Sequence, residues 1–314
     1  MASAIITELR RGGSHTLKAV QRLVQSERVE TVLAPELLHL ATSNDTNVAV
    51  PSFLAFAKLC ANSDVPTQLP SIFSAPDVAL AVSGQLQSPD IRIQAAATLA
   101  LTNLTSHNLA LESTILSRVV EALEAENAHE GIQRALLGYI GNASAVPDAS
   151  RSLLEETNCM QVLTELLQAG RGESLRSAAA LTIGNVLSTR DVMAQNQLRE
   201  VGGLPDLVLL LSSSYAPDTN ESSAWALSHG VHLNVLSQDL VGDAGAIGLL
   251  LKLVLSPEDD VRRNAIMALH SSAIGHPANL ARCKKNNGQD IVHDLLHDDL
   301  NECRTYASLL LEEF

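Results

Sequence analysis

A repeat of about 42 residues runs through the 314-residue chain and constrains its fold more than any other feature. Five segments rich in small residues recur: AAATLALTNLTSHN, IQRALLGYIGNASA, SAAALTIGNVLSTRD, SSAWALSHGVHLN and RNAIMALHSSAIGH. Each copy has a polar residue at one fixed position, namely Asn103, Asn142, Asn185, His229 and Ser271. The spacing between them is 39, 43, 44 and 42 residues. Such a period is typical of stacked helical units, in which neighbours bury the apolar face that one unit leaves open.

A second motif precedes the small-residue segments and has the same period. VGGLPDLVLLLSS and AGAIGLLLKLVLS align with Gly202 on Gly245, an offset of 43. Polar loops such as QSPD and SPEDD lead into the long segment, where Ser or Asp can cap the first helical turn. A degenerate sixth copy, PSFLAFAKLCANSD, has Leu59 at the position of the polar residue. Each unit is therefore predicted to contain a short helix, a glycine-led helix and a long helix of small residues.

This order of elements resembles the armadillo repeat, and the resemblance extends from about His15 to Phe314. HEAT repeats are the near alternative, but the glycine-led second helix and the Asn near the end of the third helix favour the armadillo type. The resemblance implies an all-α fold, a right-handed α-solenoid of about six armadillo repeats with a C-terminal capping repeat. It also implies a single domain over residues 1–314, divided into an N-terminal extension (1–14), repeats at 15–64, 65–108, 109–147, 148–190, 191–234 and 235–276, and a cap at 277–314.

The net charge of −14 limits the expected partners. Nucleic acids and anionic membranes attract Lys and Arg, so an acidic chain is not expected to bind either. A protein or an extended peptide with a basic or mixed surface is the expected partner. From Gln289 to Phe314 the chain carries seven acids and one base, Arg304, which predicts an acidic face. The acids are Asp290, Asp294, Asp298, Asp299, Glu302, Glu312 and Glu313.

The spacing of the cysteines and the length of the apolar runs indicate the cellular compartment in which the protein is expected. The four cysteines are far apart and form no CxxC pair, which favours reduced thiols over a disulfide framework. The start of the chain lacks the apolar core of a signal peptide, and no apolar run approaches the roughly 20 residues that cross a membrane. We therefore expect a cytoplasmic protein without direct membrane insertion, and a nuclear location stays open.

Neither a catalytic site nor a cofactor or metal site is predicted. The glycines of GDAGAIG lack the preceding strand that a nucleotide-binding loop needs, and no GxSxG motif occurs. His229 and His232 are expected on neighbouring positions of one helix face, with His270 near the equivalent position of the next copy. Zinc requires three or four ligands, and no cysteine aligns with these histidines. We therefore interpret them as packed or groove-lining side chains.

The armadillo resemblance implies a peptide-binding groove lined by the third helices. The Asn of the third helix typically binds the backbone of an extended peptide, which here implies Asn103, Asn142 and Asn185, with His229 and Ser271 in the last two units. In importin-α, a Trp stands four residues before that Asn. The matching positions here are Leu99, Gly138, Leu181, Trp225 and Met267, so the importin-α tryptophan ladder is absent. Trp225, the only tryptophan, is the expected aromatic anchor of the groove.

Two functions fit this prediction. The first is a non-enzymatic scaffold or adaptor whose groove binds a protein or peptide. The second is a regulator or chaperone of a small GTPase, because the small-GTPase dissociation stimulators (smgGDS type) are acidic armadillo proteins that recognise polybasic tails. Their general features are similar here, including a predicted long loop at Ser212–Ser223. That analogy concerns architecture and charge, so both functions stay open.

Overall fold

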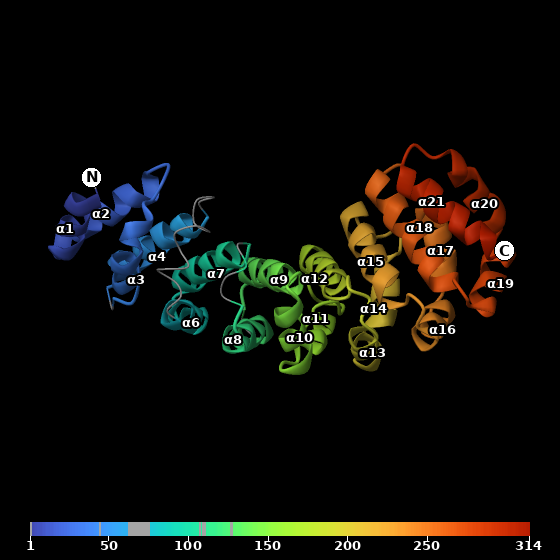
Figure 1. Cartoon of the computed structure of the whole chain (residues 1–314), viewed down its shortest axis with the longest axis horizontal. Coiled ribbons are helices and arrows are strands. Elements are labelled where there is room, and N and C mark those ends of the chain that lie inside the picture. The colour runs from blue at the N-terminus through green and yellow to red at the C-terminus, as the bar shows by residue number, and fades with distance from the viewer. Residues whose placement is uncertain (1, 44, 62–75, 107, 109–110, 126–127) are drawn as a thin grey trace. The chain divides into compact units, whose positions relative to one another are not determined.

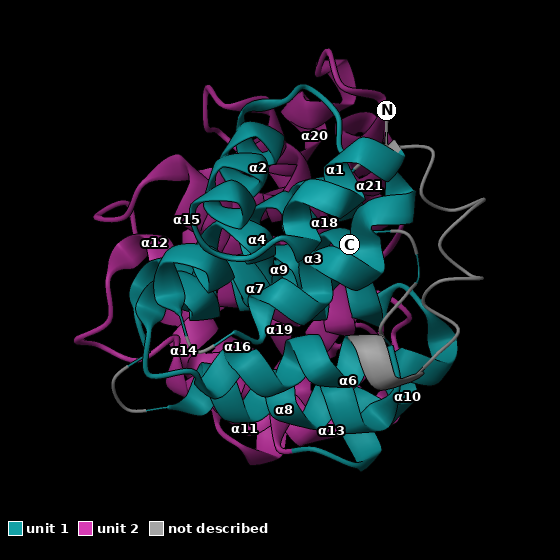
Figure 2. Cartoon of the chain, turned by 90° about the vertical axis from the view of Figure 1, so that its left-hand side faces the viewer, with its two compact units in different colours: residues 1–157 teal, residues 158–314 magenta. Residues whose placement is uncertain are grey.

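The computed structural model describes residues 2–43, 45–61, 76–106, 108, 111–125 and 128–314. These residues form α-helices and short 3-10 turns, which confirms the all-α prediction (Figure 1). The chain divides into two compact units, Met1–Thr157 and Asn158–Phe314, drawn in teal and magenta in Figure 2. Each unit has its own buried core and is described by itself.

Unit 1 contains nine α-helices and two 3-10 turns among its described residues. In chain order they are α1 (Ala2–Arg10), α2 (Gly13–Gln25), η1 (Thr31–Leu33), α3 (Ala34–Ala41), α4 (Thr46–Cys60), α6 (Pro76–Gly84), η2 (Gln85–Gln87), α7 (Ile91–Thr105), α8 (Ser113–Glu124), α9 (Glu130–Ser144) and α10 (Pro147–Glu155).

Unit 2 contains eleven α-helices and one 3-10 turn. They are α11 (Cys159–Glu165), α12 (Glu173–Val186), α13 (Val192–Glu200), α14 (Gly203–Leu210), α15 (Pro217–Gly230), α16 (Val235–Asp243), α17 (Ala246–Leu253), α18 (Asp259–Ala273), α19 (Pro277–Lys285), α20 (Gly288–Asp294), η3 (Leu295–His297) and α21 (Asn301–Glu312).

The long helices of small residues pack in succession within each unit. In unit 1, α4 packs on α7 and α7 on α9, while in unit 2 the order is α12, α15, α18 and α21. Ala97 and Ala100 of α7 and Ala265 and Ala268 of α18 are fully buried. Their small side chains let neighbouring helix backbones approach closely, which is why the sequence selects alanine at these positions. We call these seven helices the third helices.

The helix caps differ from one helix to the next. Asp90 accepts a hydrogen bond from the backbone N–H of Arg92 at the start of α7 (2.9 Å), as the QSPD loop predicts. Asp191 caps α13 by accepting from the N–H of Met193 (2.8 Å). In the SPEDD loop, by contrast, no side chain caps α18, and Ser256 instead accepts from the N–H of Glu258 (3.2 Å). The local cap chemistry thus varies while the helix positions stay periodic.

A long polar side chain near the start of the third helix fixes the turn that precedes it. Arg176 of α12 donates from Nε to the carbonyl of Leu167 (2.7 Å), and Asn220 of α15 donates from Nδ2 to the carbonyl of Leu210 (2.6 Å). The last carbonyls of a helix have no intrahelical partner, so these bonds satisfy groups that packing would otherwise leave unpaired. We call them the turn clamps, and the same position provides them five times: Gln133, Arg176, Asn220, Arg262 and Arg304.

The prediction of one long loop is wrong, whereas the predicted repeat boundaries are not tested. Ser212–Ser223 is not one long loop, because α15 already begins at Pro217 and buries Thr219, Asn220 and Ser223 in polar contacts. Proline is favoured in the first helical turn, where its missing N–H costs no hydrogen bond. The boundary predicted between residues 64 and 65 lies outside the described residues, and the remaining repeat limits stay a prediction.

The cysteines and the apolar helices are also resolved. Cys60, Cys159, Cys283 and Cys303 are buried free thiols, and burial raises the pKa of Cys159 and of Cys283 to about 12. Within the part of the chain that the structure describes, no helix has the length and hydropathy needed to cross a membrane.

The glycine-led helices yield a test of backbone conformation. Gly202 and Gly245 each precede such a helix with a left-handed backbone (φ 80° and 87°), as their alignment predicts. A Cβ atom at Gly245 would meet no atom within 4 Å, so only the backbone opposes a side chain there. We expect Gly245→Ala to lower the free energy of unfolding by about 1 kcal/mol.

Gly248 is the matched control because it lies inside α17 with equally open space around it. Gly248→Ala should raise the free energy of unfolding by about 0.5–1 kcal/mol through helix propensity. Urea denaturation of both variants measures the two signs, and equal signs would contradict the left-handed turn.

Candidate binding surface

The predicted groove residues fall on the third helices, and the richest group lies in unit 2. It consists of Asn185 on α12, Trp225 and His229 on α15, and Met267 and Ser271 on α18. Leu99 and Asn103 on α7 and Asn142 on α9 occupy the corresponding positions in unit 1. Because α12, α15 and α18 pack in succession, residues at one position form a column across them.

Trp225 lies against the backbone of the preceding third helix. A Cβ atom built at Gly184 would come within 2.1 Å of the indole Cδ1, so only glycine leaves room for the ring. The indole Nε1 donates to Oδ1 of Asn185 at 3.3 Å. The ring also meets the imidazole of His229 edge-on, with centroids 4.3 Å apart. Trp225 remains half-buried, so one part of the indole stabilises the packing of α12 on α15 and another part is open.

The column that contains Trp225 is exposed elsewhere. The side chains of Leu99 and Leu181 are 46% and 45% exposed, although both are large and apolar. Met267 is half-buried, and Gly138 has no side chain to offer. Apolar groups at these positions are therefore available to a ligand in each unit.

The asparagine column is used differently in the two units. In unit 1, Nδ2 of Asn103 donates to the carbonyl of Ala57 (3.0 Å), and Nδ2 of Asn142 donates to Oγ1 of Thr105 (3.3 Å). These amides therefore already connect neighbouring third helices. In unit 2, Asn185 accepts from Trp225, and its Nδ2 donates to no group among the described residues. Asn185 is thus the asparagine whose donor is free for a ligand.

The last two members of this column point inward. His229 is 6% exposed and Ser271 only 1%, in contrast to the half-buried asparagines. Neither ring nitrogen of His229 has a hydrogen-bond partner within the described chain, and Nδ1 of the buried His270 also lacks one. Unpaired buried polar atoms are rare in folded proteins, and each calls for an explanation.

His232 does not share a helix face with His229 as the sequence suggests. The helix α15 ends at Gly230, and His232 lies in the turn that follows. Its Nδ1 is 3.3 Å from Oγ of Ser271, and its ring centroid is 6.4 Å from that of His270. Tertiary packing rather than helix periodicity therefore brings the histidines together.

Arg190 completes this group, although no motif in the sequence predicted it. Its guanidinium makes no ion pair or hydrogen bond with the described residues, and its backbone is left-handed (φ 55°). We call Arg190, His229, His232 and His270 the histidine cluster. Positive φ recurs at the equivalent turn residues Leu233 and Gly275, so the turn is periodic and only its arginine is special. A basic residue in the turn after a third helix is the sequence signal that could have identified Arg190.

The electrostatics of the cluster keep the rings neutral. Burial, followed by the charges of Arg190 and His232, lowers the pKa of His229 to about 4. Burial and Arg190 likewise lower the pKa of His232 to about 4. Burial also lowers the pKa of His270, although Glu313 opposes this. No set of three or more His, Cys, Asp or Glu side chains in the described part of the chain is arranged to hold a metal ion.

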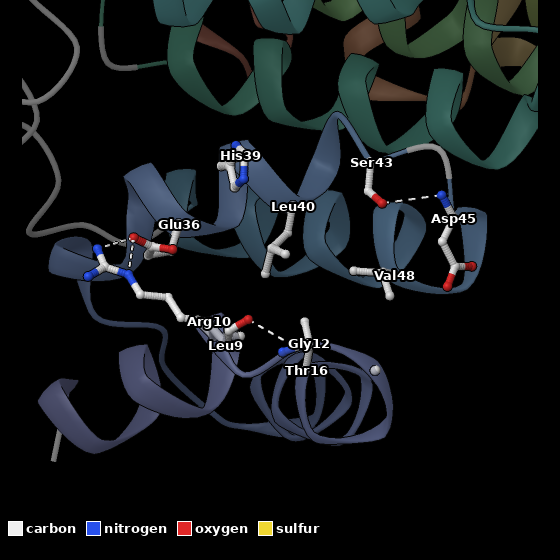
Figure 3. A pocket seen from close by; sticks show the side chains of 11 residues that line it. Leu9, Arg10, Gly12, Thr16, Glu36, His39, Leu40, Ser43, Asp45 and Val48 are labelled. Carbon is white, nitrogen blue, oxygen red and sulfur yellow. Dashed lines mark hydrogen bonds and ion pairs between the residues drawn. The ribbon is translucent and has the colours of Figure 1, made fainter.

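A separate cavity of about 520 Å³ lies in unit 1, between α1, α2, α3 and the start of α4 (Figure 3). Its polar groups bind one another: Nε of Arg10 donates to Glu36 (2.8 Å), and Thr16 accepts from the N–H of Gly12 (2.9 Å) and donates to the carbonyl of Leu9 (2.8 Å). These paired groups leave little polar chemistry directed at a ligand.

The contact between Gly184 and Trp225 can be tested by fluorescence. We expect Gly184→Ala to displace the indole from α12 and break its bond to Asn185, because the new methyl group would overlap Cδ1. The emission of the only tryptophan should shift to longer wavelength as the ring becomes more exposed. Gly138→Ala is the control, since its Cβ would lie 3.8 Å from Thr102 in ordinary contact. An unchanged spectrum in Gly184→Ala would contradict the packing described here.

The lowered histidine pKa values predict a pH dependence of stability. An unfolded histidine has a pKa near 6.5, so between about pH 6.5 and 4 the unfolded chain binds more protons than the folded one. The free energy of unfolding should therefore fall as the pH drops through this window. His229→Asn, which introduces the residue found at position 185, should reduce the slope by about 1 kcal/mol per pH unit.

Urea unfolding followed by Trp225 emission at pH 7, 6 and 5 measures that slope. His293→Asn is the control because this histidine is exposed on α20. A slope in His229→Asn equal to that of the parent chain would refute the buried neutral imidazole.

The sequence comparison gives one weak relationship. No protein-family model matches the chain. A stretch of 133 residues, 41% of the chain, is 28% identical to importin subunit alpha-6 of Arabidopsis thaliana. The match spans 24% of that protein, about a quarter of its length.

Solved structures give much closer agreement in shape. An engineered protein superposes with a TM-score of 0.81 at 22% identity, covering 98% of this chain and 77% of its own. A designed armadillo repeat protein superposes with a TM-score of 0.66 at 22% identity, covering 74% of this chain and 98% of its own. Another, solved in complex with the peptide (KR)4, has a TM-score of 0.65 at 23% identity and the same coverage. Identities this low report on the fold alone, and with the succession of helices they show that the chain folds as an armadillo-repeat α-solenoid.

Proposed function

We propose that the chain is a non-enzymatic scaffold or adaptor that binds an extended segment of a partner protein on its third helices. The observation that carries the proposal is the pair formed by Trp225 and Asn185. The indole is held in place by Gly184 and Asn185 and is still partly open, and the Nδ2 donor of Asn185 is used by no described residue. A fixed aromatic side chain beside a free amide donor suits a peptide, because the amide can bind a backbone carbonyl while the ring packs on a side chain.

The remaining predicted positions provide further contacts within each unit. Leu181, one turn before Asn185 on α12, adds a large exposed apolar group to this surface. Leu99, Asn103 and Asn142 would provide the corresponding contacts in unit 1, with the two amides contributing their oxygen atoms as acceptors. Met267 borders the surface on α18, whereas the buried His229 and Ser271 support it from beneath.

The comparisons agree with this class of function. Designed armadillo repeat proteins of the same fold include one solved with a bound peptide. We extend peptide binding to this chain as part of the proposal, because fold similarity does not determine the ligand.

A second function is favoured by the charge of the C-terminal helices. Asp290, Asp294, Asp299, Glu302 and Glu312 are exposed on or beside α20 and α21. This surface would attract a polybasic partner, as a regulator of a small GTPase requires. Under this alternative the chain would accelerate nucleotide release from a small GTPase with a polybasic tail, and salt would weaken the binding. A stoichiometric complex with unchanged nucleotide release would favour the scaffold.

Site-specific photo-crosslinking tests the binding surface directly. A photoreactive phenylalanine analogue at Leu181, beside Trp225, should capture a partner in cells that express the chain. The same analogue at Leu209, which is 61% exposed on α14 and is not one of the predicted groove positions, is the matched control.

Trp225→Ala should abolish capture at position 181 while the helical circular dichroism is retained. Equal capture at positions 181 and 209, or capture at 181 that survives Trp225→Ala, would contradict the proposal.

A further inference from the structure

The histidine cluster has donors that nothing in the described chain uses. Arg190 presents five N–H groups and makes no ion pair or hydrogen bond. Each neutral imidazole also carries one N–H, and both ring nitrogens of His229 and Nδ1 of His270 are buried without a partner. The nearby Ser271 hydroxyl is occupied by His232. The N–H groups of Arg190 outnumber the acceptor nitrogens that the neutral rings offer, so an acceptor from a ligand would satisfy donors that remain unpaired.

Charge restricts the group that could supply this acceptor. A cation would be repelled by Arg190, and the described residues provide no three-ligand metal set. The one carboxylate that acts on the cluster is Glu313, near His270, and its Oε2 already accepts from the backbone N–H of Gly275 (3.1 Å). The cluster therefore has one unpaired positive charge, which matches a singly charged carboxylate better than a doubly charged phosphate.

The cluster can be reached from the proposed binding surface. Arg190 and His232 are half-buried, whereas His229 is buried. His229 contacts Trp225 edge-on, so the histidine cluster is adjacent to the proposed aromatic anchor. On the other side, the ring of His270 lies 5.5 Å from that of Tyr306 on α21. A peptide on Trp225 and Asn185 would thus place a neighbouring side chain over Arg190.

We propose that the histidine cluster of unit 2 binds a carboxylate side chain of the partner protein. Arg190 is the charged contact, the half-buried imidazole of His232 donates an additional hydrogen bond, and the buried His229 lies beneath them. This inference rests on the proposed function, since the carboxylate belongs to the segment that Trp225 and Asn185 hold. It makes the partner mixed in charge, with an acidic residue on the cluster and basic residues available to the acids of α20 and α21.

Carboxylate binding would also be linked to protons. In the free chain the rings are neutral near pH 7, because burial and Arg190 lower their pKa values. A bound carboxylate favours the protonated imidazole and raises the pKa of the ring that it contacts. The complex would then take up protons, so affinity should rise as the pH falls from 7.5 to 5.5. The groups that act on these rings are Arg190, Glu313 and the rings themselves.

Peptide titration of the full chain tests the inference, with Trp225 emission and calorimetry as readouts. The probes are end-blocked (Glu-Ser)4, (Gln-Ser)4 and (Lys-Arg)4, and an analogue of the first with phosphoserine in place of Glu. We expect (Glu-Ser)4 to bind about ten-fold more tightly than (Gln-Ser)4, as one charge-assisted contact implies. The preference should increase at pH 5.5.

Variants of Arg190 assign the preference to the cluster. Arg190→Asn, which tolerates the left-handed backbone, should remove the preference for (Glu-Ser)4 over (Gln-Ser)4. Arg190→Lys should retain most of the preference for (Glu-Ser)4. Arg171→Gln removes the same charge from an exposed position before α12 and should have no effect.

Three results would overturn the inference. They are a Glu preference that survives Arg190→Asn, binding of (Lys-Arg)4 that is tighter than that of (Glu-Ser)4 and is lost in Trp225→Ala, and tighter binding of the phosphoserine peptide than of (Glu-Ser)4. If (Lys-Arg)4 binds and Trp225→Ala abolishes that binding, the carboxylate site is wrong while the peptide-binding function stands. If photo-crosslinking at position 181 also captures no partner, both the carboxylate site and the peptide-binding function are wrong.

Discussion

The structure depends on how each short helix ends. A helix leaves its last carbonyls without intrahelical partners, and a stack of short helices buries many such ends. The turn clamps solve this problem at five of the seven third helices, for example where Arg176 binds the carbonyl of Leu167. Two buried glutamines do the same for the third helices: Gln195 donates to the carbonyl of His229 (2.8 Å), and Gln238 donates to that of Ser271 (2.9 Å). These bonds fix how the helices of one repeat sit against each other.

Because the register of the repeat is fixed, one set of positions on each third helix packs against the neighbouring helix and another set lies at the surface. Small residues such as Ala179 and Ala180 face the neighbouring helix, which leaves Leu181 and Asn185 at the surface. The same register places Trp225 over Gly184, so the indole is supported by backbone and a single hydrogen bond. A binding side chain that is held before the ligand arrives loses less conformational entropy on binding. The surface therefore depends on the packing that also stabilises the fold.

Charge is distributed unevenly over unit 2. The chain is acidic overall, and acids are exposed along α20 and α21. The charge of Arg190 nevertheless lowers the pKa of three neutral imidazoles, and no acid among the described residues forms an ion pair with it. An overall net charge predicts the long-range attraction of a partner, whereas local pairs determine which of its side chains dock. This is why the net charge alone indicated a basic or mixed partner and could not identify a site for a carboxylate.

The sequence by itself determined the helical class, the period of the repeat and the position of the glycine-led turns, because these follow from local periodicity and from backbone preferences at residues such as Gly202 and Gly245. It also identified the column that contains Trp225. Only the tertiary structure decided that His229 is buried while Asn185 is half-open, that His232 leaves the helix to meet Ser271, and that Arg190 joins them. Residues about 40 positions apart make these contacts, and their burial depends on the packing of neighbouring repeats, which no local pattern encodes.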